Sequence, residues 1–582
     1  MKTLRLILVL TCCFLIHHYS YSQATNIICT NPTAEQIMLG NYNPNSYMQS
    51  NPITNSDTIS IKSHQWINAD SLKKFIIKLA SFRNRNTGAD TTSNSLGMGA
   101  ARKWVYSKFQ EFSSASENRL VASYLQFDQS ICAMQQHRNI FCVLPGSDTT
   151  DKSIIIIEGH IDSRCEVLCD TSCSAQGIED NASGTALVME LARVMSKFTF
   201  KNTVVFVATI GEEQGLYGAE AFADYVQQKG ILIKAVQNND VIGGVICGQT
   251  SSPPSCPFLN HIDSLNVRLF SFGNFNSAHK SYCRFIKLQY NEQLTPYISN
   301  PNVINIMSPE DRTGRGGDHI PFRQHGYTAM RFTSANEHGD ANVSNSNYTD
   351  RQHSTRDTLG VDTNNDQLVD SFFVDFNYLR RNAVINANAA AMCALGPKRP
   401  DFQVTSVGVN QIKVQITQQT QYAQYRVGIR TTTHDWDTLF TMTNTLVDTF
   451  TITPLTNFNA YVQVMSVDQD SVESIPSVEK LINVNSIGES HESLKEFELM
   501  YNKPNPFDEA TYLTFNSNSG GKKGIIIIRD LNGKEIKKIP VDIHFGMNEV
   551  LFEHGYGMTG ILTWTLSIDG KIIGSRHMNF AN

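Results

Sequence analysis

Hydrophobic residues follow two different spacings between about residues 60 and 395. Apolar side chains recur with a helical period in Ser63–Ser81, Ala100–Phe112 and Thr185–Phe198. Uninterrupted apolar runs alternate with these segments and are typical of strands buried on both faces: Asn139–Leu144, Ser153–Ile157 and Thr203–Ile210. Strands that alternate with helices predict an α/β domain with a mostly parallel twisted sheet flanked by helices. Such a fold places functional residues at the carboxyl ends of its strands.

The pattern changes after Gly396-Pro397, where helical spacing gives way to short alternating strands. The segments with this pattern are Gln411–Ile416, Tyr425–Arg430, Leu446–Ile452 and Ala460–Val467. A second series of strands begins with Thr511–Phe515 and Gly524–Asp530. We therefore predict that two small all-β sandwich domains follow the α/β domain.

The amino terminus has the pattern of a secretion signal. Lys2 and Arg5 precede the apolar run Leu6–Ile16, which at 11 residues is shorter than the roughly 20 that a membrane-spanning helix needs. We therefore favour a signal peptide cut near Ser22/Gln23 over a membrane anchor. No later segment has 18 uninterrupted apolar residues, so we expect an exported protein without a transmembrane segment.

These patterns divide the chain into five parts. The predicted boundaries are 1–22 for the signal peptide, 23–398 for the α/β domain (core about 60–395), 400–482 for the first β-sandwich, 483–497 for a polar linker and 498–582 for the last β-domain. Removal of a propeptide between about Gln23 and Asn55 is left open by the sequence.

Charge and cysteine content narrow the class of protein. With 48 basic and 54 acidic residues the net charge is −6, which argues against binding to nucleic acid or to an anionic membrane surface. Ten of the 12 cysteines lie between the signal and residue 400. An even number in an exported chain favours disulfides, also for Cys165, Cys169 and Cys173, whose spacing would alternatively allow a metal cluster.

Polar residues that could do chemistry follow the predicted strands. His160 ends one strand, and Asp162 is placed to orient its imidazole. Asp180 lies just before the helix predicted for Thr185–Phe198. Glu212 and Glu213 follow the next strand, and two adjacent carboxylates beside a buried strand are costly without a cation.

Two further candidates complete a possible metal site. Asp240 follows Ala235–Asn239, again at a strand end, and His353 lies in the segment QHSTRDT. Together with His160, Asp180 and Glu213 they make two histidines and three carboxylates, a set suited to zinc. A bridging carboxylate could complete a pair of ions.

The motifs H-x-D, D-N-x-S-G, G-E-E-x-G-L-x-G, a lone Asp and H-[ST]-x-x-D resemble those of metallopeptidase family 28, the co-catalytic zinc aminopeptidases. The resemblance covers roughly residues 60–395. It implies that His160 and Asp240 hold one zinc, that Glu213 and His353 hold a second, and that Asp180 bridges the two.

The resemblance also implies roles around the metal ligands. Glu212 would be the general base, and Asp162 the partner that orients His160. The stretch Gly317–Phe322 matches a family segment that lines the pocket, with Asp318 and His319 as candidate substrate-binding residues. Some family members have a tyrosine immediately before the last histidine, where it stabilises the oxyanion.

Here that position is Gln352, so another donor is needed, from Tyr348 or from the loop Arg312–Gly317. The implied enzyme is a secreted zinc-dependent aminopeptidase that removes N-terminal residues from peptides through a dizinc-bound hydroxide. The alternatives are a glutaminyl cyclase-like enzyme with a single zinc, a carboxypeptidase of the same family, and a catalytically inert surface-binding protein.

The two β-domains carry resemblances of their own. The first resembles a fibronectin type III module. The second, with Asn502–Phe507, the turn Asp530–Ile536 and two terminal strands, resembles the C-terminal sorting domain of type nine secretion substrates. That resemblance implies recognition by the type nine secretion machinery. The protein would then pass through the periplasm after signal peptide cleavage and end secreted or at the cell surface.

Overall fold

A computed structural model describes residues 23–246, 261–335, 351–484 and 497–580 of the chain. Short gaps within these ranges fall at 275, 313–314, 409, 418–419, 432–433, 453–457, 504, 506, 508–509, 518, 531–532, 545 and 554–559. The predicted signal peptide, Tyr348, Cys247, Cys256 and most of the predicted linker lie outside the described residues.

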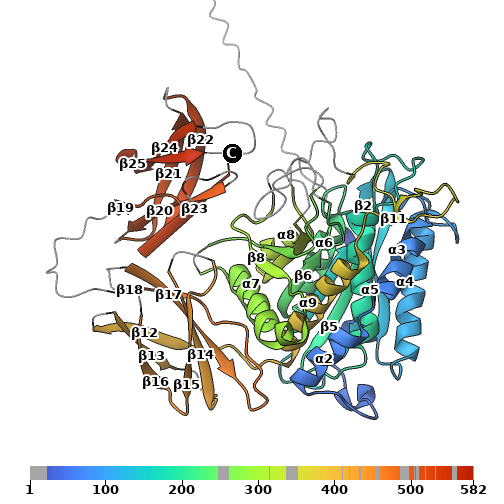
Figure 1. Cartoon of the computed structure of the whole chain (residues 1–582), viewed down its shortest axis with the longest axis horizontal. Helices are drawn as coiled ribbons and strands as arrows, with labels where there is room; N and C mark the ends of the chain where they lie inside the picture. The colour runs from blue at the N-terminus through green and yellow to red at the C-terminus, as the bar shows by residue number, and fades with distance from the viewer. Residues whose placement is uncertain are drawn as a thin grey trace, which may run out of the picture.

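The α/β domain is built on a nine-stranded sheet (Figure 1). In spatial order the strands are β1 (Thr25–Cys29), β2 (Val121–Ile131), β3 (Met134–Leu144), β5 (Thr203–Thr209), β4 (Ile154–His160), β6 (Ile233–Asn239), β9 (Ala329–Ser334), β7 (Asn266–Phe270) and β8 (Val303–Ile306). The central strands β5, β4, β6 and β9 run parallel. By contrast, β1, β2, β3 and β5 pair antiparallel, as do β9 and β7. Strands β7 and β8 at the far edge again pair parallel, so the sheet as a whole is mixed rather than mostly parallel.

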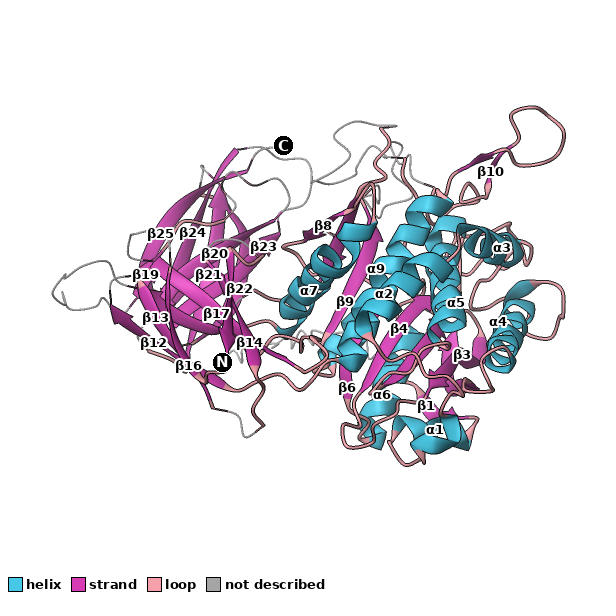
Figure 2. Cartoon of the chain, turned by 60° about the horizontal axis from the view of Figure 1, so that its bottom comes forward, coloured by secondary structure: helices cyan, strands magenta, loops and turns pink. Residues whose placement is uncertain are grey.

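Helices cover both faces of this sheet (Figure 2). One face packs against α2 (Ser56–Trp66), α3 (Ala69–Ala80), α4 (Gly97–Ser114), α5 (Ser183–Met195), α7 (Ala278–Gln289) and α9 (Phe376–Leu395). The other packs against α1 (Pro32–Met38), α6 (Tyr217–Lys229) and α8 (His319–Gln324). Strand β4 shows why its sequence is uninterruptedly apolar: Ile155 and Ile157 enter the first core, and Ile154 and Ile156 enter the second.

The first elements of the domain show two further details. The helical period of Ser63–Ser81 is divided between α2 and α3, because Asn68 stands between them and its side chain accepts the backbone N–H of Asp70 at 2.7 Å. Strand β1 and helix α1 belong to the packed domain, with Ile37 and Met38 buried in the second core. Residues from Thr25 onward are therefore part of the folded domain, and β1 forms one edge of its sheet.

The carboxyl-terminal part consists of two all-β sandwiches, as predicted (Figure 1). The first pairs β12 (Phe402–Gly408), β13 (Gln411–Ile416) and β16 (Val447–Thr451) in one sheet and β15 (Thr438–Thr443), β14 (Gln424–Arg430), β17 (Phe458–Val467) and β18 (Lys480–Val484) in the other. The second pairs β19 (Phe497–Leu499), β20 (Ala510–Ser517) and β23 (Gly546–Glu553) with β22 (Glu535–Ile543), β21 (Lys522–Asp530), β24 (Gly560–Ile568) and β25 (Lys571–Phe580). Each sandwich buries its own apolar core.

A buried polar network joins the first sandwich to the α/β domain. Arg284, on α7, donates from Nε to Gln463 Oε1 at 3.0 Å and from Nη2 to Glu479 Oε1 at 3.3 Å. Arg430 of the sandwich donates to the same Glu479 carboxylate at 2.7 Å. Because all these side chains are buried, the two domains share an interior at this point.

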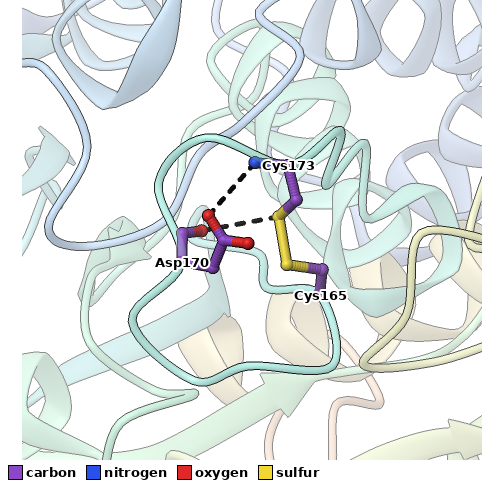
Figure 3. Close-up of side chains that lie close together, drawn as sticks. All are labelled: Cys165, Asp170 and Cys173. Atoms are coloured by element: carbon purple, nitrogen blue, oxygen red, sulfur yellow. Dashed lines mark hydrogen bonds between the residues drawn. A yellow bond between two sulfur atoms is a disulfide. The ribbon is translucent and has the colours of Figure 1, made fainter.

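The described cysteines are only partly paired. One disulfide joins Cys165 to Cys173 (Figure 3), and another joins Cys132 to Cys169. These cysteines therefore tie a loop together and do not form a metal cluster. The remaining described cysteines are free and buried: Cys29, Cys142, Cys283 and Cys393. The predicted disulfides are therefore present for Cys132, Cys165, Cys169 and Cys173, whereas the four free cysteines pack as small apolar side chains.

Among the described helices, none combines the length and the hydropathy that spanning a bilayer requires.

Candidate active site

The strand ends bring the first group of predicted residues together. His160 is the last residue of β4 and lies beside Thr209, the last residue of β5. Glu212 and Glu213 follow β5 after a short turn, and Asp240 directly follows β6. Because β5, β4 and β6 are adjacent and parallel, side chains that follow them meet at one edge of the sheet.

Two other segments reach this edge from elsewhere in the chain. Asp180 lies in the turn Ile178–Ala182, immediately before α5. This turn can approach β6 because residue 184 is glycine: a Cβ there would lie 2.1 Å from the Asn239 carbonyl oxygen. His353 comes from the loop before α9 and has a φ of +56°, a left-handed conformation that is strained for a residue other than glycine. Such strain is typical of functional positions.

The first cluster of possible ligands surrounds His160. Its Nε2 lies 3.2 Å from Asp180 Oδ1, 3.3 Å from Asp240 Oδ1 and 4.0 Å from Glu212 Oε2. Ligand atoms of His160, Glu212 and Asp240 all lie within 4.8 Å of one another. This spacing would allow a metal ion to be held among them.

The second cluster surrounds His353. Its Nε2 lies 3.1 Å from Asp180 Oδ2 and 3.2 Å from Glu213 Oε2, and the ligand atoms of these three residues also lie within 4.8 Å of one another. Asp180 thus directs one oxygen to His160 and the other to His353. That is the arrangement expected of a carboxylate that bridges two ions.

The charges at this site are poorly balanced by the protein alone. Burial raises the pKa of Glu212 well above its usual value, and the nearby carboxylate of Asp240 acts in the same direction, against His160. Burial likewise raises the pKa of Glu213, assisted by Asp180. Burial also acts to raise the pKa of Asp180, but hydrogen bonds from His160 and His353 hold it well below its usual value.

The donor atoms present fit zinc. Burial, with Arg315 nearby, lowers the pKa of His353 to about 4, so this imidazole is neutral near pH 7 and able to bind a metal. The Oε1 atom of Glu213 is buried without a hydrogen-bond partner among the described residues. Imidazole nitrogen and carboxylate oxygen are the ligands of catalytic zinc, and a cation would compensate the unpaired carboxylate oxygen.

Asp162 lies where it was predicted, behind His160. The backbone carbonyl of Asp162 is 3.1 Å from His160 Nδ1, and its carboxylate oxygen is 3.5 Å from the same atom. The carboxylate also accepts the backbone N–H groups of Glu212 at 3.4 Å and Glu213 at 3.2 Å. Asp162 therefore directs Nε2 of His160 towards the acidic cluster and also positions the two glutamates.

Asp318 and His319 were predicted to bind substrate, but they do not line the cavity described below. Both are fully buried behind the site, at the start of α8, and they are not among the residues that line the pocket. Asp318 accepts a hydrogen bond from the Thr209 hydroxyl, and burial raises its pKa to about 7. Asp318 therefore supports the end of β5, whereas Nε2 of His319 lies 3.2 Å from the carbonyl oxygen of Glu310.

Sequence reasoning missed two buried supporting residues. The carboxylate of Asp357 accepts the backbone N–H groups of Glu179 and Asp180, each at 3.0 Å. Arg85 donates to the carbonyl oxygens of Ile161 at 2.8 Å and Gly177 at 2.9 Å, so it joins the segments before and after the disulfide-bonded loop. Asp357 is the last residue of the H-[ST]-x-x-D motif, so this motif could have indicated its role. Arg85 belongs to none of the motifs and could not have been found in this way.

A cavity of about 390 Å³ opens onto both clusters. Its lining includes Asp180, Glu212, Glu213, Asp240 and His353, together with Gln352 and the arginines Arg164, Arg312, Arg315 and Arg331. Of the two predicted sources of an oxyanion donor, Tyr348 lies outside the described residues. The loop Arg312–Gly317 contributes Arg315, whose Nη1 is 3.2 Å from His353 Nε2.

Two solved structures match this chain at low similarity. The LapA aminopeptidase of Legionella pneumophila is 16% identical, with 58% of this chain and 74% of that chain covered and a TM-score of 0.42. The glutaminyl cyclase of Porphyromonas gingivalis is 15% identical, with coverage of 55% and 97% and a TM-score of 0.38.

Sequence comparison is more decisive. Residues 139–374 match peptidase family M28. A probable zinc metalloprotease of Leptosphaeria maculans is 30% identical over 389 residues, 63% of this chain and 84% of that protein. One of Pyrenophora tritici-repentis is 30% identical over 358 residues, 59% and 77% of the two chains. The chain therefore belongs to peptidase family M28, among zinc metalloproteases.

Proposed function

We propose that the protein is a dizinc aminopeptidase that removes N-terminal residues from peptides. The observation that carries the proposal is the position of Asp180, whose two carboxylate oxygens face two separate histidine–carboxylate clusters. His160 and Asp240 would hold one ion, Glu213 and His353 the other, with Asp180 between them. A single-ion site would need only one of the two clusters.

When bound, the zinc ions supply Lewis-acid activation of the attacking water and of the scissile carbonyl group. The chain's own residues supply proton transfer and orientation. Glu212 lies at the cavity wall beside the first cluster, where it accepts the proton of the attacking water and passes it to the departing amine. Because its pKa is raised by burial, the Glu212 carboxylate is a stronger base than an exposed one.

Replacing Glu212 with Gln tests this proposal. We expect the variant to retain two zinc ions per chain, measured by elemental analysis, and to lose at least a hundredfold in turnover of aminoacyl chromogenic substrates. Glu220→Gln, a carboxamide change eight residues further along on α6, is the matched control and should keep full activity. One zinc per chain together with cyclisation of N-terminal glutamine would instead indicate a glutaminyl cyclase, and full activity of Glu212→Gln would exclude Glu212 as the base.

We also propose that the protein is exported and processed at both ends. The disulfides Cys132–Cys169 and Cys165–Cys173 support an oxidising compartment. The last sandwich would act as a type nine secretion sorting domain, and the first, of fibronectin type III kind, would remain with the peptidase. Terminal sequencing of the secreted protein tests this. We expect it to begin near Gln23 and to lack residues after about 498, whereas an intact cytoplasmic chain would contradict the proposal.

A further inference from the structure

The cavity wall is rich in arginine. In the part of the chain that the structure describes, four arginines line it, whereas its apolar side chains are Leu216 and Val241. Ligand pockets are usually lined mainly by apolar and aromatic side chains, with few polar groups. A pocket of this composition is poorly suited to a large hydrophobic side chain.

Two of the arginines contact the buried carboxylate of Asp311. Arg331 donates from Nη1 to Asp311 at 2.8 Å, and its Nη2 lies 2.9 Å from Asp240 Oδ2. Arg312 lies 3.5 Å from the same Asp311 carboxylate. Arg331 is buried and therefore helps to hold Asp240 in place.

The other two arginines flank the second cluster from the cavity side. Arg164 Nε lies 3.9 Å from Glu213 Oε2, and Arg315 Nη1 lies 3.2 Å from His353 Nε2. Glu213 and His353 are themselves 3.2 Å apart, so the two guanidinium groups lie against the same carboxylate–imidazole pair. Both arginine charges help to lower the pKa of His353, after burial.

Arg164 is held on a braced loop. It directly precedes Cys165, which is bonded to Cys173 (Figure 3). Cys169 of the same loop is bonded to Cys132 on the hairpin between β2 and β3. Cross-links at both positions restrict the loop before any ligand arrives. A preorganised guanidinium loses less freedom when it binds an anion, and its planar fork matches a carboxylate.

Arg164 and Arg315 both lie on the cavity wall beside the second cluster, where a carboxylate inside the cavity can approach their guanidinium groups. A guanidinium group attracts a carboxylate by its charge and can bind both of its oxygens at once.

We propose that Arg164 and Arg315 form a carboxylate-binding subsite that selects acidic substrates, an inference that rests on the proposed peptidase function. The carboxylate can come from two sources. It is either the side chain of an N-terminal Asp or Glu, or the C-terminal α-carboxylate of a short peptide. In the second case the enzyme acts on dipeptides or from the carboxyl end.

Matched substrate pairs test the proposal on the zinc-loaded full chain. Glu- and Gln-p-nitroanilide differ only in one charge at the side chain, and Leu-Gly and Leu-Gly-amide differ only at the C-terminus. In one pair, we expect kcat/KM to be roughly tenfold to a hundredfold higher for the anionic substrate than for the neutral one. The difference should come from a lower KM, with kcat nearly unchanged. The pair that responds identifies the source. Equal rates within both pairs would overturn the subsite while leaving the peptidase function intact.

Binding gives a readout that does not depend on turnover. Calorimetric titration of the same dipeptide and its amide, and of glutamate and glutamine, into zinc-loaded Glu212→Gln should show the same anionic preference. If no substrate is hydrolysed by the wild type, the proposed function fails, but this titration still decides the subsite. Equal affinity within both pairs would reject it.

Substitution of the arginines separates recognition from structural support. Arg164→Gln and Arg315→Gln should each lower the anionic preference towards unity, and added salt should do the same in the wild type. Arg138→Gln, which removes an arginine on the outer part of β3 that donates to Gln126, is the matched control and should leave the preference unchanged. An unchanged ratio in both pocket variants would mean that these arginines only support the fold.

Discussion

The carboxylate of Asp357 fixes the backbone of Asp180: Oδ2 of Asp357 accepts the Asp180 N–H at 3.0 Å. The other oxygen, Oδ1, accepts the N–H of Glu179 at the same distance, and all three residues are buried. Asp180 is the residue whose side chain faces both histidines. Asp357 therefore determines where the proposed bridging carboxylate can lie, although it belongs to a segment far along the chain.

Replacing Asp357 with Asn should weaken zinc binding. The amide has one acceptor in place of two, so one of the backbone N–H groups would face an NH₂ donor and the turn at Asp180 would shift. Loss of such an outer support typically lowers metal affinity 10- to 100-fold. Competition with a chromogenic chelator measures the change.

Asp375→Asn is the matched control for this experiment. Asp375 also accepts two backbone N–H groups, from Asn377 and Tyr378, but at the start of α9. Its replacement should change neither stability nor zinc affinity appreciably, because one oxygen of Asp375 accepts both N–H groups and asparagine caps helices about as well as aspartate. Unchanged affinity in Asp357→Asn would show that the turn at Asp180 does not depend on this contact.

Replacing Arg85 should destabilise the α/β domain. Its guanidinium is fully buried and bonds to the carbonyl oxygens of Leu79, Ile161 and Gly177. Arg85→Met would leave these acceptors unpaired, and we expect a loss of roughly 3–5 kcal/mol.

Urea unfolding measures this loss. Arg85→Lys should recover little stability, because an ammonium group cannot reach several separated carbonyl groups as the guanidinium does. Equal stability of Arg85→Lys and the wild type would show that charge alone is required.

The strand-end part of the site could be predicted from the sequence. His160, Glu213 and Asp240 each follow an apolar run, and adjacent parallel strands bring such positions to one edge. The residues that support the site could not be predicted in this way. Arg85 lies in an irregular segment that follows α3. Its partners are backbone carbonyl groups, which every residue has, so the sequence does not indicate which ones it contacts. The position of Arg164 and Arg315 on one wall depends on loops whose path no hydrophobic period encodes.

The parts of the fold that were mispredicted have local causes. The sheet was expected to be mostly parallel because the central apolar runs dominate its sequence. Strands β2 and β3 are instead joined by a tight hairpin and extend the edge antiparallel. The helical period across Ile67 and Asn68 is continuous, but Asn68 accepts backbone N–H groups and starts a new helix. Here a single capping interaction overrides a periodicity that spans both helices.

The contact between the α/β domain and the first sandwich should be sensitive to acid. Burial acts to raise the pKa of Glu479, but Arg284 and Arg430 hold it below its ordinary value of 4.5. Because the folded-state pKa is lowered, the carboxylate stabilises the protein fully above the ordinary pKa. This stabilisation is lost as the pH falls through the folded-state pKa.

We therefore expect Glu479→Gln to lower the unfolding free energy by roughly 3–5 kcal/mol at pH 7. The difference from the wild type should shrink as the pH falls below about 4.5, the ordinary pKa of the group. Urea unfolding at a series of pH values measures it, with the exposed Glu498→Gln as control. A difference that is constant down to pH 2.5 would show that the charge of Glu479 does not contribute.

The two disulfides should differ in how much they stabilise the protein. Cys132 and Cys169 are 37 residues apart, whereas Cys165 and Cys173 are 8 apart. A cross-link that closes a longer loop removes more freedom from the unfolded chain. We therefore expect Cys132→Ser/Cys169→Ser to cost about 4 kcal/mol and Cys165→Ser/Cys173→Ser about 2.5 kcal/mol. Urea unfolding under oxidising conditions measures both, and the differences should vanish in excess reductant. The reverse order would show that packing around the sulfur atoms outweighs loop closure.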